Sequence, residues 1–328
     1  MSNDNRDDIE LVVWPGDFGL LSIDTTCLQA MVAAKIAAAP VRFKFSTNSK
    51  ESPSGELPAL FHGRDVCTTF EEIADHLRNT KGDLQDVVLD GDLTQVQRSD
   101  FLSYASYLRT QLYPALLQTM WVDNSNYSTV TQYWFTSKMS FPWNMWYVES
   151  RRQFAKDYLA TIDRTEGDIL KDALKVLNNL SAKLGDSKYF TGDKPCSLDA
   201  LIFGYLAPLL KFPFPNDRIQ IHLASLPNLA RFVESVICIY LPLTDEEIRY
   251  QNVTKSFWET RKKKAQKVSE EIRQRQAANE AESESAGSTS LRDTIMFGVG
   301  AVTLSVLFAV HTGIISFIQD DDTGIDDY

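Results

Sequence analysis

The chain has 328 residues, of which 44% are hydrophobic, and a formal net charge of −11 at pH 7. This length suits one large folded domain or two smaller ones. The acidic balance argues against nucleic acid as a partner, because the phosphates would be repelled. The four cysteines and four histidines show no zinc-ligand spacing, so we expect no metal site and reduced thiols.

Residues 1–8 are polar and acidic, and we expect them to be disordered. Residues 9–80 carry strand-like runs and two helical stretches, separated by turn residues. The predicted elements are, in order, a strand at 9–14, a helix from 24 to 39, a strand at 41–46, a hairpin within 57–67 and a helix at 69–79. The order βαβ followed by ββα is that of a thioredoxin-like domain.

Pro58 stands at the start of the third predicted strand. Proline cannot donate a hydrogen bond to a sheet, so it occupies the first positions of a strand. In thioredoxin-like domains the proline at this place is held in the cis form, which predicts a structural role for Pro58. The alternative is an ordinary trans proline in a loop.

Residues 93–243 change to a helical period and predict an all-α domain. One long helix is predicted over 96–122, with a bend at Pro114. The further predicted helices lie at 149–163, 166–184, 200–211 and 227–240. The helix at 200–211 is apolar on nearly all sides, so we expect it to be buried.

Residues 244–293 are rich in charge and then in Ala, Glu, Ser and Gly. We interpret 257–279 as a solvated helix and 280–290 as a flexible linker. The segment would tie the folded domains to a membrane. Its basic cluster, residues 261–264, is typical of a solvated helix face, and anionic lipid is the alternative contact.

Residues 294–319 contain no Lys, Arg, Asp or Glu. As a helix this segment would be about 39 Å long, against a bilayer core of about 30 Å. It therefore predicts a single transmembrane helix at the C-terminal end, a buried core helix being the alternative. Ala301, Ser305, Ala309 and Gly313 recur every four residues and form a narrow face on which another helix can pack closely.

The flanks of this segment predict its orientation. Basic residues precede it, whereas the tail at 320–328 holds five aspartates and no basic residue. The basic side should remain in the cytosol, so the tail crosses the membrane, as in tail-anchored proteins. Hydropathy leaves the endoplasmic reticulum, the mitochondrial outer membrane and the peroxisome open.

The segment 133–147 holds seven aromatic residues, among them Trp134, Trp143 and Trp146. Trp and Tyr are enriched in binding hot spots and in membrane-interface belts. Core packing between two helices is the alternative, and we favour it for most of these rings. One or two rings should be exposed for a partner.

Four motifs carry a resemblance to a known family: VVWPGDFGLLSID, SPSGELPAL, HLRN and YFTGDKPCSLDALIFGYL. Together with the predicted anchor they resemble the metaxin family over residues 9–243. The resemblance implies an α+β fold like that of glutathione transferases, with an N-terminal thioredoxin-like domain and a C-terminal all-α domain.

The resemblance also implies a function. Metaxins are non-enzymatic subunits of the sorting and assembly machinery of the mitochondrial outer membrane, which folds β-barrel proteins. The implied partners are a metaxin-2-like subunit, the β-barrel core subunit, the lipid bilayer, and kinesin and mitochondrial Rho GTPase adaptors. The N-terminal domains would be cytosolic and the short tail would lie in the intermembrane space.

The alternative is a membrane-anchored glutathione transferase. Such an enzyme activates the thiol of glutathione with a hydroxyl or cysteine after the first strand, where this chain offers Ser22, Thr25, Thr26 and Cys27. It also holds a carboxylate with a serine at a helix start, where this chain has Phe70. A phenyl ring cannot donate to a carboxylate. Cys27 lies within an Ala-rich helix and is typical of a packed thiol, so we expect no catalytic residue and no cofactor.

One departure from the fold family concerns the buried helix of the α-domain. There a Ser or Thr normally stands three residues before Asp, as a capping box. Here Cys196 holds that position before Asp199, with Ser197 beside it. A thiol is a weak acceptor, so we expect the cap to move to Ser197 or to be lost, while Asp199 still benefits from the helix dipole.

Overall fold

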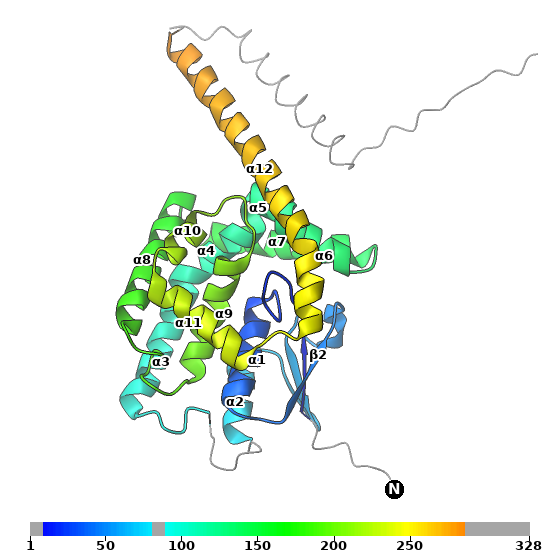
Figure 1. Ribbon diagram of the computed structural model, residues 1–328, viewed down its shortest axis with the longest axis vertical. Helices are drawn as coiled ribbons and strands as arrows, with labels where there is room; N and C mark the ends of the chain where they lie inside the picture. The colour runs from blue at the N-terminus through cyan, green and yellow to red at the C-terminus, as the bar shows by residue number, and fades with distance from the viewer. Residues whose placement is uncertain (1–8, 81–88, 286–328) are drawn as a thin grey trace, which may run out of the picture. The chain divides into compact units, whose positions relative to one another are not determined.

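The first apolar run forms a central strand of a four-stranded sheet. The computed structural model describes residues 9–80 and 89–285 (Figure 1). β1 (Ile9–Val13) lies parallel to β2 (Val41–Phe45) and antiparallel to β3 (Ala59–His62), which pairs with β4 (Asp65–Cys67). The order β2-β1-β3-β4, with Ile9 opposite both Val41 and His62, confirms the predicted small α/β domain.

Two helices complete this half. α1 (Thr25–Ile36) begins where the carboxylate of Asp24 accepts the backbone N–H of Cys27 at 2.9 Å, as predicted. It is buried along nearly its whole length. α2 (Phe70–Asn79) is amphipathic and buries one face through Phe70, Ile73, Ala74 and Leu77.

The second half is helical, and its longest helical stretch was predicted as one helix over 96–122. The structure keeps this stretch helical but divides it into four segments. α3 (Gln95–Tyr107) is followed by a wide π-helical segment at Leu108–Leu112, then by α4 (Tyr113–Leu117) and by a second π-helical segment at Gln118–Val122. Pro114 lies in α4 between the two π segments. Its missing N–H removes an α-helical hydrogen bond at this turn, and the wider turns flank that gap.

The other helical segments before α12 include both predicted and unpredicted ones. In chain order they are α5 (Asn124–Asn126), a π segment at Tyr127–Thr131, α6 (Gln132–Lys138), α7 (Trp143–Thr161), α8 (Glu166–Leu184), α9 (Ser197–Lys211), α10 (Arg218–Ala224) and α11 (Pro227–Tyr240). Residues 124–138 are helical where no helix was predicted, and α7 starts before the predicted 149 because its first turn is apolar rather than periodic.

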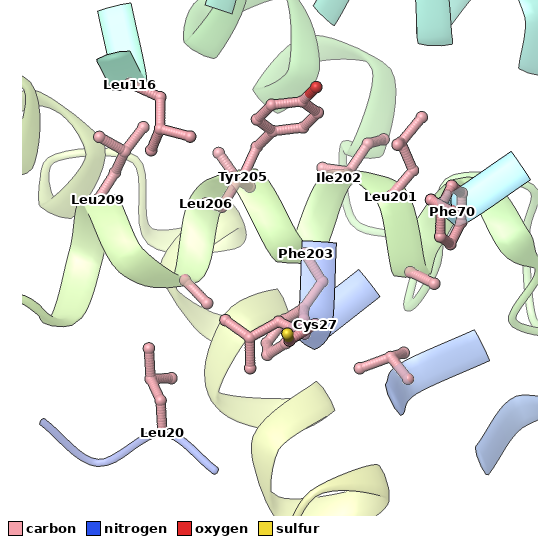
Figure 2. Close-up of a cluster of buried hydrophobic side chains, with 14 of the residues drawn as sticks. Leu20, Cys27, Phe70, Leu116, Leu201, Ile202, Phe203, Tyr205, Leu206 and Leu209 are labelled. Atoms are coloured by element: carbon pink, nitrogen blue, oxygen red, sulfur yellow. The ribbon is translucent and has the colours of Figure 1, made fainter. Parts of the chain in front are cut away.

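α9 is the shared core of the two halves. All residues from Ser197 to Leu209 are buried, which confirms the predicted burial of this helix. Figure 2 shows Phe203 pointing from α9 toward Cys27 of α1. The Gln29 side chain of α1 also donates to the Leu201 carbonyl of α9 at 3.1 Å.

The last described helix, α12 (Asp245–Ser285), corrects the interpretation of 244–293. It begins well before the predicted 257 and continues through 280–285, where a linker was predicted. It is not solvated throughout, because Trp258 is only 6% exposed. The chain divides into two compact units, Met1–Lys267 and Val268–Tyr328.

Within residues 9–80 and 89–285, no single helix has the length and apolar character needed to cross a membrane. One bent pair, α10 with α11 at an angle of 91°, meets the criterion only when both helices are taken together. The predicted span at 294–319 with its small-residue face, the tail at 320–328 and the start at 1–8 lie outside the described residues.

Candidate functional site

The loop between β1 and α1 is the place where a transferase-like fold would hold its activating group. It starts with Trp14, which is only 1% exposed, and turns through Phe18 and Gly19 at positive φ values of 59° and 81°. The Asp17 carboxylate is buried in this loop and accepts the indole N–H of Trp134 at 3.1 Å. Burial raises the pKa of Asp17, against the opposing effect of the Phe18 N–H.

Side chains of α12, at the C-terminal end of the first unit in the sequence, cover this loop. The Gln251 side chain accepts the Gly19 N–H at 2.7 Å and donates to the Leu20 carbonyl at 3.2 Å. The ring of Trp258 packs edge-on against Phe18 with 5.1 Å between centroids. The chain therefore fills the approach to the loop with its own side chains.

Of the four candidate activating groups after β1, Ser22 and Cys27 are buried, whereas Thr25 and Thr26 are half-buried at the start of α1. Ser22 is fully buried and its hydroxyl accepts the Asp24 N–H at 3.3 Å. Cys27 is also fully buried, and burial, reinforced by the Asp24 charge, raises the pKa of its thiol well above the usual range. The thiol therefore remains protonated near neutral pH, the state that does not act as a nucleophile.

The N-terminus of α2, where a transferase would hold the carboxylate of glutathione, is occupied by the chain itself. The Glu72 carboxylate accepts the N–H groups of Thr68 and Thr69 at 2.9 and 3.2 Å, and the Thr69 hydroxyl accepts the Glu72 N–H at 3.3 Å. Phe70 is only 3% exposed and belongs to the core. This capping box uses donors that an external carboxylate would need.

Pro58 lies directly before β3, and the Leu57–Pro58 peptide bond is cis, in agreement with the sequence pattern. Glu56, two residues before Pro58, forms an ion pair with Arg151 of α7. The region around the proline is thereby linked to the helical half. The negative charge of Asp24 also stabilises the Arg151 guanidinium electrostatically. Two carboxylates of the N-terminal half therefore interact with one arginine of the helical half.

The N-terminus of α9 keeps a capping box although the Cys196 thiol stands where a hydroxyl is usual. The Asp199 carboxylate accepts the N–H groups of Cys196 and Phe190, each at 2.8 Å, so its half of the capping box is intact. Ser197 does not become the cap: its N–H and hydroxyl donate to Asp90, at 2.8 and 2.6 Å. The expected shift or loss of the cap is therefore wrong: Cys196 keeps its place in the capping box, and Asp90 adds a second acceptor from far away in the sequence.

Burial sets the protonation chemistry at this helix end. It raises the pKa of Asp199 to about 6, although the N–H of Phe190 opposes the shift. It also raises the pKa of the Cys196 thiol to about 12, so this thiol stays protonated and donates to Asp199 at 3.2 Å. Asp90 also accepts the Arg78 guanidinium at 2.8 Å, which ties α2 to the start of α9.

The three candidate tryptophans separate into two groups. Trp134 is 1% exposed and bonded to Asp17, so the prediction that it is available to a partner is wrong. Trp143 and Trp146 are 54% and 66% exposed and stand at the start of α7. Of the seven rings in 133–147, only Trp134, Phe135 and Tyr147 are buried, so the prediction that most of these rings pack in the core is wrong.

Two family models match the chain. Residues 27–152 match a family described as an outer mitochondrial membrane transport complex protein, and residues 173–236 match the C-terminal domain of glutathione S-transferase. A Metaxin-1 homolog from Caenorhabditis briggsae is 45% identical over 317 residues, which are 96% of this chain and 99% of that protein. The chain belongs to the metaxin family. The family predicted from the sequence motifs is thus confirmed.

More distant metaxins match a shorter part of the chain. Metaxin-1 from Homo sapiens is 34% identical over 266 residues, which are 77% of this chain and 55% of that protein. Metaxin-3 from Danio rerio is 36% identical over 242 residues, which are 71% of this chain and 75% of that protein.

Solved structures show the fold of this metaxin. Glutathione transferases from Phanerochaete chrysosporium and Ceriporiopsis subvermispora each give a TM-score of 0.52 and cover 73% of the chain. The matches span 99% and 100% of those chains at 14% and 13% sequence identity, so the likeness concerns the fold alone. The fold is glutathione-transferase-like, with a small N-terminal sheet and a mostly helical C-terminal region.

Sequence reasoning missed three residues that shape the candidate site of this metaxin: Asp17, Asp90 and Gln251. Their partners lie 117, 107 and 232 residues away, so no local pattern marks them. Asp17 lies inside one of the quoted motifs, which is the one signal that pointed to its loop. Among the described residues, no group of three or more His, Cys, Asp or Glu side chains could hold a metal ion.

The last residue of β3, His62, and His76 of α2 form a pair that predicts a pH effect on stability. His62 Nδ1 and His76 Nε2 lie 2.9 Å apart, so one ring must be neutral to accept the bond. Burial, and then the nearby His62, lower the pKa of His76. The folded state thus binds a proton less readily than the unfolded state. The stabilisation should be complete above about pH 6.5 and decline as the pH falls below it.

We expect denaturant midpoints of the full chain to fall between about pH 7 and about pH 5, and to fall less in His76→Gln. His222→Gln is the control, because His222 pairs with Asn178 rather than with another histidine. An equal fall in His76→Gln and the unsubstituted chain would show that the pair does not contribute.

Proposed function

We propose that this metaxin is a tail-anchored, non-enzymatic scaffold subunit in protein import and β-barrel assembly at the mitochondrial outer membrane. The family match to an outer mitochondrial membrane transport complex protein supports the location and the process. The uncharged run at 294–319 supports the anchor, with the folded domains cytosolic and the acidic tail in the intermembrane space.

The observation that carries the non-enzymatic role is the state of the transferase site. α12 fills the approach to the loop after β1 through Gln251 and Trp258, and Glu72 uses the donors at the start of α2. The Cys27 thiol is buried and protonated. A glutathione molecule would have to displace the side chains of α12 and the Glu72 cap of α2 before it could bind.

The proposed mechanism is positional. An anchor confines a binding surface to the membrane plane, and this raises the effective concentration of partners without strong individual contacts. A metaxin-2-like subunit and the β-barrel core subunit are the proposed partners, and Ala301, Ser305, Ala309 and Gly313 form the proposed packing face within the bilayer. Kinesin and mitochondrial Rho GTPase adaptors are the proposed partners for a transport role.

The test is recovery of partners from mitochondria. We expect the tagged full chain, solubilised in mild detergent, to bring down the outer-membrane β-barrel core subunit and a second metaxin. A chain that lacks residues 294–328 should lose both, because it is no longer held in the membrane. The same preparation should pass through immobilised glutathione without retention.

Retention on glutathione together with conjugation of an electrophile would contradict the scaffold role and favour the membrane-anchored transferase. Cys27→Ser is the matched variant for that outcome. It should leave partner recovery unchanged, and it would abolish conjugation only if the thiol were catalytic.

A further inference from the structure

The turn between α6 and α7 presents a group of large apolar side chains to solvent. Phe141, Trp143, Met145 and Trp146 are 80%, 54%, 51% and 66% exposed. We call these four residues the aromatic turn. Trp143 and Trp146 lie three residues apart in α7 and so project from one face of the helix. Exposed rings of this size cost free energy in water unless something covers them.

The aromatic turn has a fixed shape. The buried Asn144 donates to the Thr136 carbonyl of α6 at 3.1 Å and accepts the N–H of Met145 at 2.8 Å. The next residues, Tyr147 and Val148, are buried in the core. The exposed rings are therefore held outward by the fold, and their exposure does not result from fraying.

The charges that precede the aromatic turn in the sequence are basic, whereas the exposed Glu149 follows it one helical turn after Trp146. Residues 124–148 contain no Asp or Glu, although the whole chain carries a net charge of −11. The Lys50 ammonium lies 3.3 Å from the ring centroid of Trp143, and Lys138 ends α6 at the beginning of the turn. The nearest acidic neighbour of Lys50 in the chain, Glu51, is paired with Lys44 at 2.8 Å.

Figure 1 shows the turn between α6 and α7 protruding from the folded unit at the right of the view. Protruding tryptophans with lysines beside them are suited to the headgroup layer of a bilayer. There the rings lie at the apolar boundary, and the cations meet lipid phosphates. A protein partner would more typically offer carboxylates to Lys50 and Lys138 and a pocket to the rings.

We propose that the aromatic turn is a second membrane contact, at which Trp143 and Trp146 insert into the headgroup layer of a phospholipid bilayer that contains anionic lipid. This inference rests on the proposed membrane location of the chain. It adds a contact that orients the folded unit on the surface, in addition to the predicted span at 294–319. The basic residues supply attraction to anionic headgroups, and the rings supply apolar burial.

Intrinsic fluorescence can test the contact, because the other four of the six tryptophans are buried. Trp14, Trp121, Trp134 and Trp258 are 1%, 5%, 1% and 6% exposed. The full chain is reconstituted into vesicles of phosphatidylcholine and phosphatidylinositol, with or without bromine near the headgroup end of the acyl chains. Bromine should quench part of the emission, and Trp143→Ser/Trp146→Ser should lose that quenching.

The matched control is Val96→Ser/Leu102→Ser, which removes two side chains of α3 that are 72% and 70% exposed but lie far from the turn in the sequence. This variant should be quenched as strongly as the unsubstituted chain. Circular dichroism of both variants checks that they fold.

The other possible results distinguish the proposed anchor at 294–319 from the proposed membrane contact of the aromatic turn. A chain that does not sediment with vesicles overturns both the anchor and the aromatic turn as membrane contacts. A chain that sediments without bromine quenching overturns the aromatic turn alone. Loss of a co-purified protein from Trp143→Ser/Trp146→Ser, in the absence of quenching, would assign the turn to a protein partner.

Discussion

Replacement of Asp90 by alanine is expected to lower the free energy of unfolding by about 3–5 kcal/mol, because it breaks a largely buried charge pair. The side chain of Asp90 is only 7% exposed and pairs with Arg78 at 2.8 Å. It also accepts both the N–H and the hydroxyl of Ser197, at 2.8 and 2.6 Å. Its loss would leave the Ser197 N–H at the start of α9 without this acceptor, and would remove the carboxylate that joins Arg78 of α2 to Ser197 of α9.

Asp92→Ala is the matched control. Asp92 pairs with Lys194, but the two side chains are 74% and 78% exposed, so its removal should cost less than about 1 kcal/mol. Chemical denaturation of the full chain and both variants gives the two differences. Similar losses in the two variants would show that the acceptor supplied by Asp90 to the start of α9 does not stabilise the fold.

Gly204→Ala is expected to lower the free energy of unfolding by about 2–4 kcal/mol, because a methyl group has no room between α9 and α1. A Cβ at this position would lie 2.3 Å from the Gln29 side chain and 2.7 Å from the Thr25 carbonyl. Movement of Gln29 would sacrifice its buried hydrogen bond to Leu201, and the backbone of Thr25 cannot yield without a shift of α1. The better helix propensity of alanine, worth about 1 kcal/mol, offsets only part of this loss.

Gly167→Ala is the control for helix propensity. Gly167 lies in α8, and the nearest atom to an added Cβ is 3.8 Å away, an ordinary contact. This variant should gain up to about 1 kcal/mol. Thermal or chemical unfolding that shows both glycine variants equally stable would mean that α1 and α9 separate without cost.

The N-terminal half could be predicted from local pattern because its elements carry local signals. Asp24 caps α1 through a bond to a residue three positions away, and a strand of alternating polarity follows Pro40. The all-apolar composition of α9 likewise predicted its burial. Such features depend on neighbours in the sequence, which a single sequence displays.

The candidate site could not be predicted in the same way. Trp134 and Trp146 have similar sequence surroundings, yet one is bonded to Asp17 in the core and the other is exposed. α12 is charged along most of its length, so its one buried tryptophan gives no periodic signal. The additional acceptor that Asp90 supplies to the start of α9 also comes from a residue 107 positions away.

The contacts of α12 also determine when the first unit can finish folding during synthesis. Gln251 and Trp258 cover a loop that the ribosome made more than two hundred residues earlier. The contact of Phe18 with Trp258 therefore cannot form until the first turns of α12 have emerged, although Phe212 can pack on Phe18 earlier. The run at 294–319 is the next long apolar stretch to leave the exit tunnel. Folding of the first unit would thus be completed immediately before the appearance of the segment proposed to direct the chain to its organelle.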